Sequence, residues 1–488
     1  MSEQFDLVII GAGPGGYSTA LRAAELGMKV ALIERDATVG GTCLNRGCIP
    51  SKALITATHT IDTVHRAAEL GVNASVNGID FGTLRDYRLR VVKTMVGGLA
   101  GLLAHRGITV FRANAAFHAD ETAPATSNHI VHLVPSPDQS DILTYHKADV
   151  PEPSGPTMDL TATKPRPLPG NPFAGALIDS TQALEVNEFP SSAVIIGAGA
   201  IALEFASMWN AAGSKVTLLI RKDRVLSAWD RRAGTTLTRE LKRHGVNIIT
   251  RASVTHVDTG ANLGATVHYT REGQDGEQSV WGEIALVAIG RDPITDPAWG
   301  VTIDDHGHVA TDAYGRTDKP GVWAVGDVTA GHALAHRAFE QGIVIAETIA
   351  GLNPKPVDEA TVPQIVFSFP EAASVGLTVE QAQAREDLIE IKETNYPMLA
   401  NARMLMSGTA GSLTIVSGCD AANPDTPRVL GVHMVSQMAS DIIAEAEQLV
   451  GNHVPLADAA RLVHPHPTFS ETLGEALLKA DGRPLHTR

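Results

Sequence analysis

Two stretches of the chain repeat one pattern of apolar and polar positions, which predicts the order strand, turn, helix, strand. The first stretch covers residues 6–35, and its apolar run at 7–10 is typical of a buried strand. A glycine-rich turn follows, and a helix with apolar residues on one face leads to a second strand at 30–33. Residues 193–220 repeat this design. Two such units predict an α/β fold with two doubly wound domains, each built on a parallel sheet.

The remaining pattern differs along the chain. Residues 120–175 are rich in Pro, Thr and Asp, which favours an irregular excursion between the two units. A strand is expected at 321–327 (GVWAVGD) and a helix at 333–351. After residue 363, the segments QIVFSF, SLTIVSG and RVLGVHMV predict strands, and helical patterns follow them. This last part is therefore predicted to be a C-terminal α+β domain.

Composition and charge exclude several classes of protein. The net charge is −15 and the basic residues are scattered, so nothing supports nucleic-acid binding. No uncharged apolar stretch reaches the roughly 18–20 residues that a membrane span requires, and MSEQFDLVII does not resemble a signal peptide. Three cysteines are too few for a secreted disulfide framework. We expect a cytoplasmic protein without a membrane partner.

The turn of the first unit carries Gly11-x-Gly13-x-x-Gly16 between the predicted strand and helix. The first Gly permits a tight turn, the second lets a pyrophosphate approach the backbone, and the third lets helix and strand pack closely. Glu34 ends the second strand, where a carboxylate can bind ribose hydroxyls. Strand, helix and acid in register predict a dinucleotide site.

The second unit carries Gly197-x-Gly199-x-x-Ala202, the alanine variant of the same motif. The residue equivalent to Glu34 is Ile220, and three basic residues follow it: Arg221, Lys222 and Arg224. Basic side chains here suit the 2′-phosphate of NADP. The alternative, that RKDR is a solvated turn, remains equally open.

Cys43 and Cys48 allow three interpretations. Two dinucleotide sites imply a flavin and a nicotinamide, and a thiol pair beside a flavin can relay two electrons to or from a disulfide. A metal site would need further ligands at short spacing, so we predict none, and two buried inert thiols are the remaining alternative. Cys419, in the turn-like SGCDAAN, is expected to be incidental.

Thiol chemistry also needs a base, because only the thiolate attacks. The candidate is His466, in HPHPTFSE. Glu471, five residues on, could fix the tautomer of His466 and stabilise its imidazolium form.

With these residues assembled, the chain resembles the FAD-dependent pyridine nucleotide-disulfide oxidoreductases along nearly its whole length, and among them the dihydrolipoyl dehydrogenases. GGTCLNRGCIPSKAL (40–54) resembles their redox-active disulfide motif, and AIGRDP (288–293) and GVWAVGDV (321–328) resemble their later flavin signatures. VFSFPEAASVGLT, NYPMLANARM and HPHPTFSE resemble their dimer-forming domain.

The resemblance implies a role for each matching residue. The catalytic residues would be Cys43, Cys48, His466 and Glu471, with the last two serving the cysteines of the other subunit of a homodimer. Asp327 would bind the flavin ribityl chain, Lys52 and Glu204 would pair near flavin N5, and the helix that includes Ala335 would run beneath the isoalloxazine. Cofactor contacts are also implied for Gly41, Thr42 and Gly290.

The resemblance also implies four domains: FAD-binding (1–177), NAD(P)-binding (178–286), FAD-completing (287–358) and interface (359–488). The expected reaction is oxidation of protein-bound dihydrolipoamide, on the lipoyl domain of a 2-oxoacid dehydrogenase or related complex, with FAD and NAD as cofactors and NADP possible. Three positions depart from the family pattern: Ile220, Arg46 beside the disulfide, and TATKPRPLPG at 161–170.

Two other functions remain open. The basic cluster at 221–224 favours an NADPH-dependent reductase of glutathione or another small disulfide. A flavin-binding scaffold with an inactive cysteine pair is the non-enzymatic alternative. Reduction of the flavin by a dithiol would distinguish an enzyme from such a scaffold.

Overall fold

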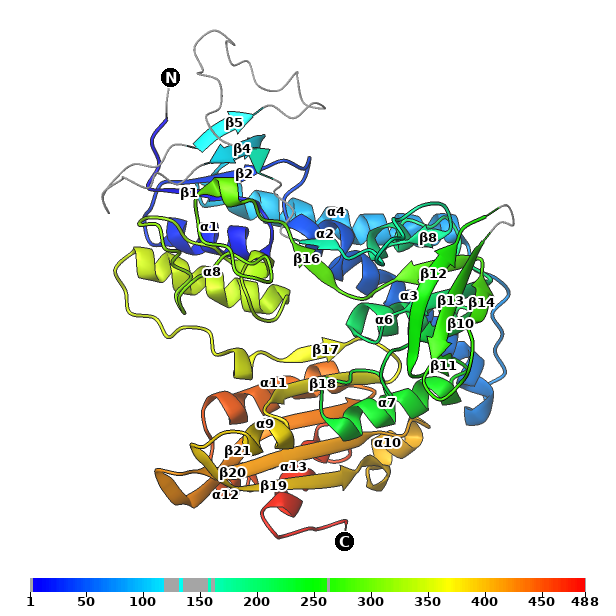
Figure 1. The fold of residues 1–488 in the computed structure, drawn as a ribbon. Coiled ribbons are helices and arrows are strands. Elements are labelled where there is room, and N and C mark those ends of the chain that lie inside the picture. Colours follow the sequence, from blue (N-terminus) through cyan, green and yellow to red (C-terminus); the bar gives the residue numbers. More distant parts are fainter. Residues whose placement is uncertain (1–2, 118–130, 135–156, 159–162, 261–263, 488) are drawn as a thin grey trace. The chain divides into compact units, whose positions relative to one another are not determined.

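The computed structural model describes residues 3–117, 131–134, 157–158, 163–260 and 264–487 (Figure 1). The chain forms two compact units that each combine three segments. Unit 1 comprises residues 1–53, 82–165 and 291–359, and unit 2 comprises residues 54–81, 166–290 and 360–488. Among the described residues, no helix is long and apolar enough to cross a membrane.

Unit 1 is built on a parallel sheet of β1 (Leu7–Ile10), β2 (Val30–Glu34) and β3 (Thr109–Arg112), in that order. Helix α1 (Pro14–Glu25) connects β1 to β2, as the first βαβ pattern predicts. Its small buried residues pack in one core with Leu32 of β2 and with Val96 and Leu103 of the long helix α4 (Phe81–His105). The parallel sheet predicted for the first unit is confirmed.

Short strands account for residues 131–134, 157–158 and 163–165 of the expected excursion, whereas residues 166–175 form turns and isolated bridges, as an irregular segment predicts. β5 (Val131–Val134) and β6 (Thr157–Met158) pair antiparallel with β4 (Asn114–Phe117), and β7 (Thr163–Pro165) pairs with β16 (Arg291–Pro293). In these places the chain is extended rather than irregular, because it completes ladders begun elsewhere in unit 1. The rest of the expected excursion, at 120–130, 135–156 and 159–162, lies outside the described residues.

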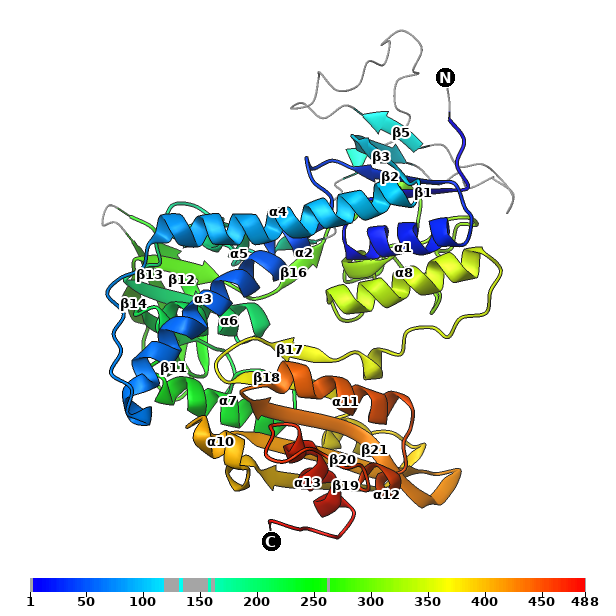
Figure 2. The ribbon, with the colours of Figure 1, turned by 180° about the vertical axis from the view of Figure 1, so that it is seen from behind.

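Helix α8 (Ala335–Ile349) lies beside α1 in both views of the molecule (Figures 1 and 2). The helix expected at 333–351 is therefore present. The strand expected at 321–327 is not, since Trp323 makes only an isolated bridge to Arg316, and the one-turn 3₁₀ helix η4 (Gly326–Val328) follows. Gly321 and Gly326 both have positive φ and leave only four residues between two turns.

Unit 2 contains a second parallel sheet of five strands. Their order is β11 (Asn247–Ile249), β10 (Lys215–Leu219), β9 (Ser192–Ile196), β15 (Ile284–Val287) and β8 (Leu177–Ile178). Helix α6 (Ala200–Ala211) joins β9 to β10, which confirms the second predicted βαβ unit. A smaller antiparallel sheet of β12 (Ala252–Asp258), β13 (Ala265–Arg271) and β14 (Gln278–Gly282) packs beside it.

Helices lead into and out of these sheets. α3 (Cys48–Arg66) begins in unit 1, and its residues from Leu54 onward belong to unit 2. The 3₁₀ turn η1 (Ala67–Leu70) follows it, and α5 (Ser180–Ala183) and α7 (Arg231–Arg243) contact the five-stranded parallel sheet of unit 2. α2 (Gly41–Arg46) is a short helix directly before α3.

The C-terminal part of unit 2 is a five-stranded antiparallel sheet, which confirms the α+β prediction. Its order is β17 (Gln364–Val366), β18 (Glu371–Gly376), β21 (Asn423–Ser436), β20 (Ser412–Asp420) and β19 (Leu388–Pro397). Helices α11 (Ala439–Gly451), α12 (Leu456–Ala459) and α13 (Glu471–Ala480) cover one face (Figure 2). The short helices α9 (Val379–Gln383) and α10 (Ala402–Met406) complete this part.

Candidate active site

The glycines of the first motif form a tight strand-to-helix turn in unit 1. Gly11 has a φ of +94°, a conformation that L side chains rarely adopt. A Cβ on Gly16 would lie 1.9 Å from the carbonyl oxygen of Gly11, so the third position must be Gly. A Cβ on Gly13 would meet nothing closer than 4.0 Å, which leaves this side of the turn open. No side chain caps the N-terminus of α1, so its backbone N–H groups suit a pyrophosphate.

Replacing Gly16 with Ala should therefore remove flavin from unit 1. The added methyl group would force the turn apart, because its contact is with rigid backbone rather than a flexible side chain. Gly98→Ala is the matched control, since Gly98 is exposed within α4 with nothing within 4 Å of its built Cβ. We expect the control to retain FAD and gain about 0.5–1 kcal/mol of stability. A Gly16→Ala protein with full flavin content, measured by absorbance after desalting, would contradict this account of the turn.

Glu34 lies at the end of β2 and is 3% exposed. Its Oε2 accepts a hydrogen bond from the Ala12 amide and its Oε1 accepts one from the Asp36 amide, each at 2.9 Å. Burial raises the pKa of the Glu34 carboxyl, and these backbone donors oppose that rise. A carboxylate has about four acceptor positions, so Glu34 can still accept hydrogen bonds from two ribose hydroxyls.

The loop after β2 packs against the glycine turn. Gly41 has a φ of +56°, and a Cβ there would lie 2.6 Å from the Cα of Gly13. Thr42 follows in α2. Arg46, also in α2, pairs with Asp36, so its guanidinium ties α2 to the loop after β2. The structure thus gives the unusual Arg46 a structural partner.

Asp327, in η4, and helix α8 both pack next to α1 in unit 1. Burial raises the pKa of the Asp327 carboxyl, and the guanidinium groups of Arg291 and Arg337 oppose that rise. The Gly326 amide donates to Gln341 of α8 at 3.0 Å, which anchors η4 on that helix. Helix α8 begins at Ala335 and follows an extended Leu334, whose apolar side chain cannot cap the helix. A buried carboxylate and the N-terminus of a helix fit the hydroxyls and carbonyl oxygens of a flavin.

Cys43 and Cys48 lie together in unit 1, although they belong to different helices. Cys43 is in α2 and is half-buried, whereas Cys48 is exposed and begins α3. A hydrogen bond with Cys48, together with burial, raises the pKa of the Cys43 thiol, while the charge of Lys52 lowers it. Cys48 starts a 19-residue helix, and such an N-terminus stabilises negative charge. The two thiols are therefore adjacent but electrostatically different.

Tyr17 is a neighbour of this pair that the sequence pattern does not reveal. Burial, with smaller effects of Cys43 and Cys48, raises the pKa of the Tyr17 hydroxyl to about 12. The ring lies 5.7 Å from that of Phe339 in α8. Cys419, by contrast, is 1% exposed in β20, and burial raises the pKa of its thiol.

His466 and Glu471 form a hydrogen-bonded pair in the C-terminal part of unit 2. The Nδ1 of His466 lies 2.7 Å from the Oε2 of Glu471. The other carboxylate oxygen, Oε1, accepts a hydrogen bond of 2.8 Å from Nδ2 of Asn401. Asn401 is 3% exposed and also donates to the carbonyl of Thr468 at 2.9 Å. The Glu471 carboxylate is thereby fixed, and it can orient the imidazole so that Nε2 is left to act as a base.

His466 remains accessible, whereas its neighbour His464 does not. The side chain of His466 is 73% exposed. His464 is 10% exposed, and its Nε2 lies 2.8 Å from Oε1 of Glu445. The hydrogen bond with Glu445 raises the pKa of the His464 imidazole. A Cβ on Gly474 would lie 2.3 Å from the His464 ring, so this glycine makes room for it. His464 thus anchors the segment that presents His466.

The second glycine motif forms a similar turn in unit 2. A Cβ on Gly197 would lie 2.2 Å from the carbonyl oxygen of Ala288 and 3.4 Å from the Cβ of Ala202. The backbone of Ala288, rather than Ala202, therefore excludes a side chain at Gly197. Gly199 precedes α6, meets nothing within 4 Å and has no side-chain cap. This N-terminus also suits a pyrophosphate.

A buried apolar residue follows directly on β10, the next strand after this turn and helix α6. Ile220 is 1% exposed, so no acceptor for ribose hydroxyls stands at this position. Arg221 and Lys222 are exposed, whereas Arg224 is 15% exposed. Arg224 bonds within its own loop, to Asp223 at 3.2 Å and to the carbonyl of Ser227 at 3.1 Å. Of the three basic residues, Arg221 and Lys222 are therefore the better placed for a ligand.

Glu204 and Gly290 also lie in unit 2. Glu204 is 7% exposed in α6, and its Oε1 accepts a hydrogen bond from the Phe367 amide at 3.2 Å. Gly290 has a φ of +128°, and its carbonyl accepts the Arg166 amide at 3.1 Å. Lys52 belongs to unit 1, so its pairing with Glu204 stays a prediction.

Comparison with known proteins identifies the class. Residues 5–342 match the pyridine nucleotide-disulphide oxidoreductase family, and residues 362–477 match the dimerisation domain of that family. The chain therefore belongs to the pyridine nucleotide-disulphide oxidoreductases and is a flavoprotein disulfide oxidoreductase. The family depends on FAD and NAD(P), and the dimerisation domain supports a homodimer.

Particular relatives are similar over the whole chain. Dihydrolipoyl dehydrogenase of Geobacillus stearothermophilus is 34% identical, over 99% of this chain and 97% of the relative. The Cupriavidus necator protein of that name is 35% identical, over 100% of both. Among solved structures, LpdA from Mycobacterium tuberculosis has a TM-score of 0.82 at 25% identity, covering 97% of this chain and 99% of that one. The HOCl-induced flavoprotein disulfide reductase RclA from Escherichia coli, a Cu(II) complex, has a TM-score of 0.77 at 25% identity, covering 98% and 99%.

Proposed function

We propose that this enzyme oxidises dihydrolipoamide, carried on a lipoyl domain, to lipoamide and passes the electrons to NAD(P)⁺. The observation that carries the proposal is the fixed His466–Glu471 pair, with 2.7 Å between Nδ1 and Oε2. A dithiol substrate enters as two neutral thiols, so its oxidation requires a base to remove protons. Relatives at 34–35% identity named dihydrolipoyl dehydrogenase favour this substrate.

In the first step of the proposed reaction, Nε2 of His466 takes a proton from one thiol of the substrate. The resulting substrate thiolate attacks the Sγ of Cys43, the Cys43–Cys48 bond breaks, and Cys48 leaves as a thiolate. The second substrate thiol then attacks the substrate sulfur of the mixed disulfide, the bond from that sulfur to Cys43 breaks, and the proton of the second thiol passes to the released Cys43. The substrate leaves as a cyclic disulfide. The cysteine pair now holds the two electrons that the substrate has lost.

The residues of unit 1 favour this order of events. The hydrogen bond and burial that raise the pKa of Cys43 suit a sulfur that takes up a proton on release. The start of α3 stabilises the negative charge that Cys48 acquires. The first glycine turn, Glu34 and Asp327 would hold FAD, whose chemistry would be the two-electron transfer between the cysteine pair and the nicotinamide. His466 would come from the second copy of a homodimer, as the resemblance implies.

Steady-state assays test this proposal directly. We expect turnover with dihydrolipoamide and a nicotinamide, and little with glutathione disulfide and NADPH. The dithiol should also reduce the bound flavin in the absence of nicotinamide, which a flavin-binding scaffold could not show. If the enzyme reduces glutathione disulfide with NADPH but does not oxidise dihydrolipoamide, the proposed substrate is wrong.

A second candidate is an NADPH-dependent reductase of a small disulfide. Ile220 favours it, because a buried apolar residue neither rewards the 2′-hydroxyl of NAD nor repels a 2′-phosphate. Arg221 and Lys222 are exposed directly after it and can offer charge-assisted hydrogen bonds. The same features would also allow NADP⁺ to accept the electrons in the dihydrolipoamide reaction.

Replacing Arg221 with Ala should raise the Michaelis constant for NADPH roughly tenfold and leave that for NADH nearly unchanged. A charge-assisted hydrogen bond contributes about 1.5–3 kcal/mol when partly desolvated, and each 1.4 kcal/mol changes affinity tenfold. Arg239→Ala is the control, because that side chain is 64% exposed on α7. A wild-type enzyme that does not use NADP(H) would show that the RKDR segment is only a solvated turn.

A further inference from the structure

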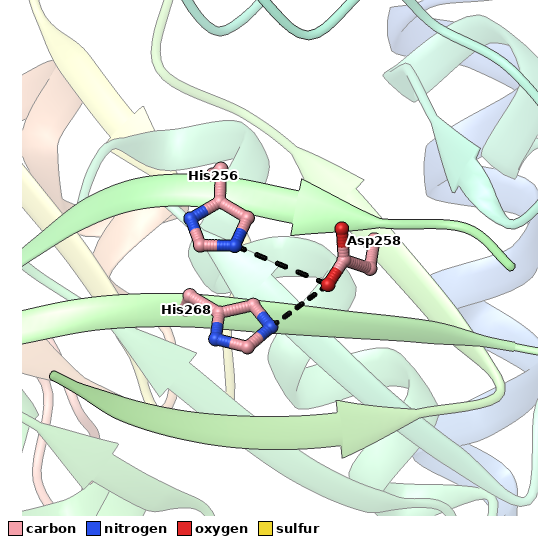
Figure 3. Close-up of side chains that lie close together, drawn as sticks. All are labelled: His256, Asp258 and His268. Atoms are coloured by element: carbon pink, nitrogen blue, oxygen red, sulfur yellow. Dashed lines mark hydrogen bonds and ion pairs between the residues drawn. The ribbon is translucent and has the colours of Figure 1, made fainter.

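Two histidines and an aspartate meet on the antiparallel sheet of unit 2, on strands that no step of the reaction uses (Figure 3). His256 and Asp258 lie on β12, and His268 lies on β13. One ligand atom from each residue lies within 4.8 Å of those of the others. We propose that His256, Asp258 and His268 bind a late first-row divalent cation of the Zn²⁺ type.

A β-bulge creates this arrangement. Val254 pairs with Tyr269, but the next pair in register is His256 with His268, so Thr255 is an extra residue on β12. Bulges re-aim the side chains that follow them. This one places the two imidazoles directly opposite each other, with ring centroids 4.1 Å apart and planes 7° apart. Asp258, two residues after His256, projects from the same face of β12.

The distances suit coordination to one ion. The Oδ2 of Asp258 lies 3.1 Å from Nε2 of His268 and 3.9 Å from Nε2 of His256. Tetrahedral bonds of about 2.0–2.2 Å to N and O ligands separate neighbouring ligand atoms by about 3.3–3.5 Å. The observed distances bracket that range. Because the stacked imidazole planes are nearly parallel, both rings must also rotate until their lone pairs point at the same ion.

A second carboxylate supports the histidines from their other side. Glu277 places Oε1 3.7 Å from Nδ1 of His256 and Oε2 3.6 Å from Nδ1 of His268. The Thr255 hydroxyl donates to Oε1 of Glu277 at 2.6 Å, which fixes that carboxylate. Histidines that bind metal through one nitrogen commonly present the other to a carboxylate.

Charge and ligand type define the class of ion. Neutral imidazoles are the metal-binding form, so the two carboxylates leave two negative charges that a divalent cation would balance. Imidazole with carboxylate suits Zn²⁺, Cu²⁺ and Ni²⁺ rather than Mg²⁺ or Ca²⁺, which prefer all-oxygen sites. The side chains of His256, Asp258 and His268 are 46%, 65% and 22% exposed, so an ion can enter from solvent and retain water.

Calorimetric titration of the oxidised holoenzyme with Zn²⁺ tests the proposal, since the oxidised Cys43–Cys48 pair offers no thiolate. We expect one site per chain in the wild type. The affinity should fall at least about 100-fold in the double variant His256→Gln/His268→Gln and roughly tenfold in Glu277→Gln, as second-sphere losses commonly do. His306→Gln, at an exposed histidine of unit 1, should bind as the wild type does.

A second measurement identifies the ligands. With one equivalent of Cu²⁺, electron paramagnetic resonance should show two equatorial nitrogens in the wild type and one in His268→Gln. Asp258→Asn keeps both histidines, so it separates loss of a ligand from loss of the fold. The metal-free melting temperature and the FAD content of each variant show whether that variant is folded. Zn²⁺ uptake that is absent from the wild type, or equal in the double variant, would overturn the proposal.

Discussion

Replacing His466 with Ala should slow the reaction with dithiol about 10²–10⁴-fold, the usual effect of losing a general base. The reason is geometric: Glu471, which is itself fixed by Asn401, holds His466 by Nδ1, so Nε2 of His466 is the group that can take the substrate proton. Reduction of the flavin by NADH does not involve a dithiol, so that half-reaction should survive. Stopped-flow measurement of the two half-reactions separates these effects.

His105→Ala is a suitable control, because this histidine is exposed at the end of α4. Glu471→Gln should give a smaller loss than His466→Ala, since the amide can still hold the ring but no longer stabilises its positive charge. Equal loss in both half-reactions would indicate misfolding or a failed dimer. An unchanged dithiol rate would remove His466 from the mechanism.

Replacing Cys43 with Ser should abolish turnover with dithiol, because no disulfide can then form. Cys48 should remain as a thiolate at the start of α3. If that sulfur faces the flavin, the resting Cys43→Ser enzyme should show a long-wavelength thiolate-to-flavin charge-transfer band without any reductant. Cys48→Ser should also be inactive with dithiol but should lack the band. The absorbance spectra of the two variants decide the assignment, and a band in Cys48→Ser alone would reverse the two roles.

Much of the fold follows from local sequence patterns. Both βαβ units combine a buried apolar strand, a glycine turn and a helix, and each of these signals arises within about 30 residues. The glycines of these turns predict the local structure well, because a side chain at their positions would clash or be strained. The positive φ of Gly11 and the 1.9 Å contact that a Cβ at Gly16 would make leave no alternative residue.

Elements that depend on distant partners could not be predicted in this way. β18 consists mostly of small buried residues without alternation, and it is a strand because it pairs with β17 and β21. The segment at 321–327 shows the opposite case, since its apolar residues suggest a strand that flanking turns prevent. The strand β5 could not be predicted either, because the composition around it is typical of a loop and it forms a strand by pairing with β4.

The residues of the candidate site also divide into those that a local sequence pattern suggests and those that only the fold brings together. His466 and Glu471 are five residues apart, so a sequence can suggest the pair, and the structure joins them. Asn401 lies 70 residues from Glu471, and no local signal links the two. Tyr17 likewise belongs to the helix after the first glycine turn, and only folding brings it to the cysteines. A bulge at Thr255, which sequence does not reveal, creates the histidine pair on β12 and β13.

The close packing of α1, η4 and α8 also bears on how firmly a flavin would be held. A Cβ on Gly15 would lie 2.7 Å from Val325, and one on Gly342 would lie 2.2 Å from the Ser18 hydroxyl. At Gly342 the two helices meet almost backbone to backbone, since a Cβ there would also lie 2.8 Å from the Thr19 amide nitrogen. The rings of Tyr17 and Phe339 also pack against each other between the helices. A site built in this way is ordered before its ligand arrives, so little conformational entropy is lost on binding. Slow release of the cofactor, and its retention through purification, are the expected consequences of that rigidity.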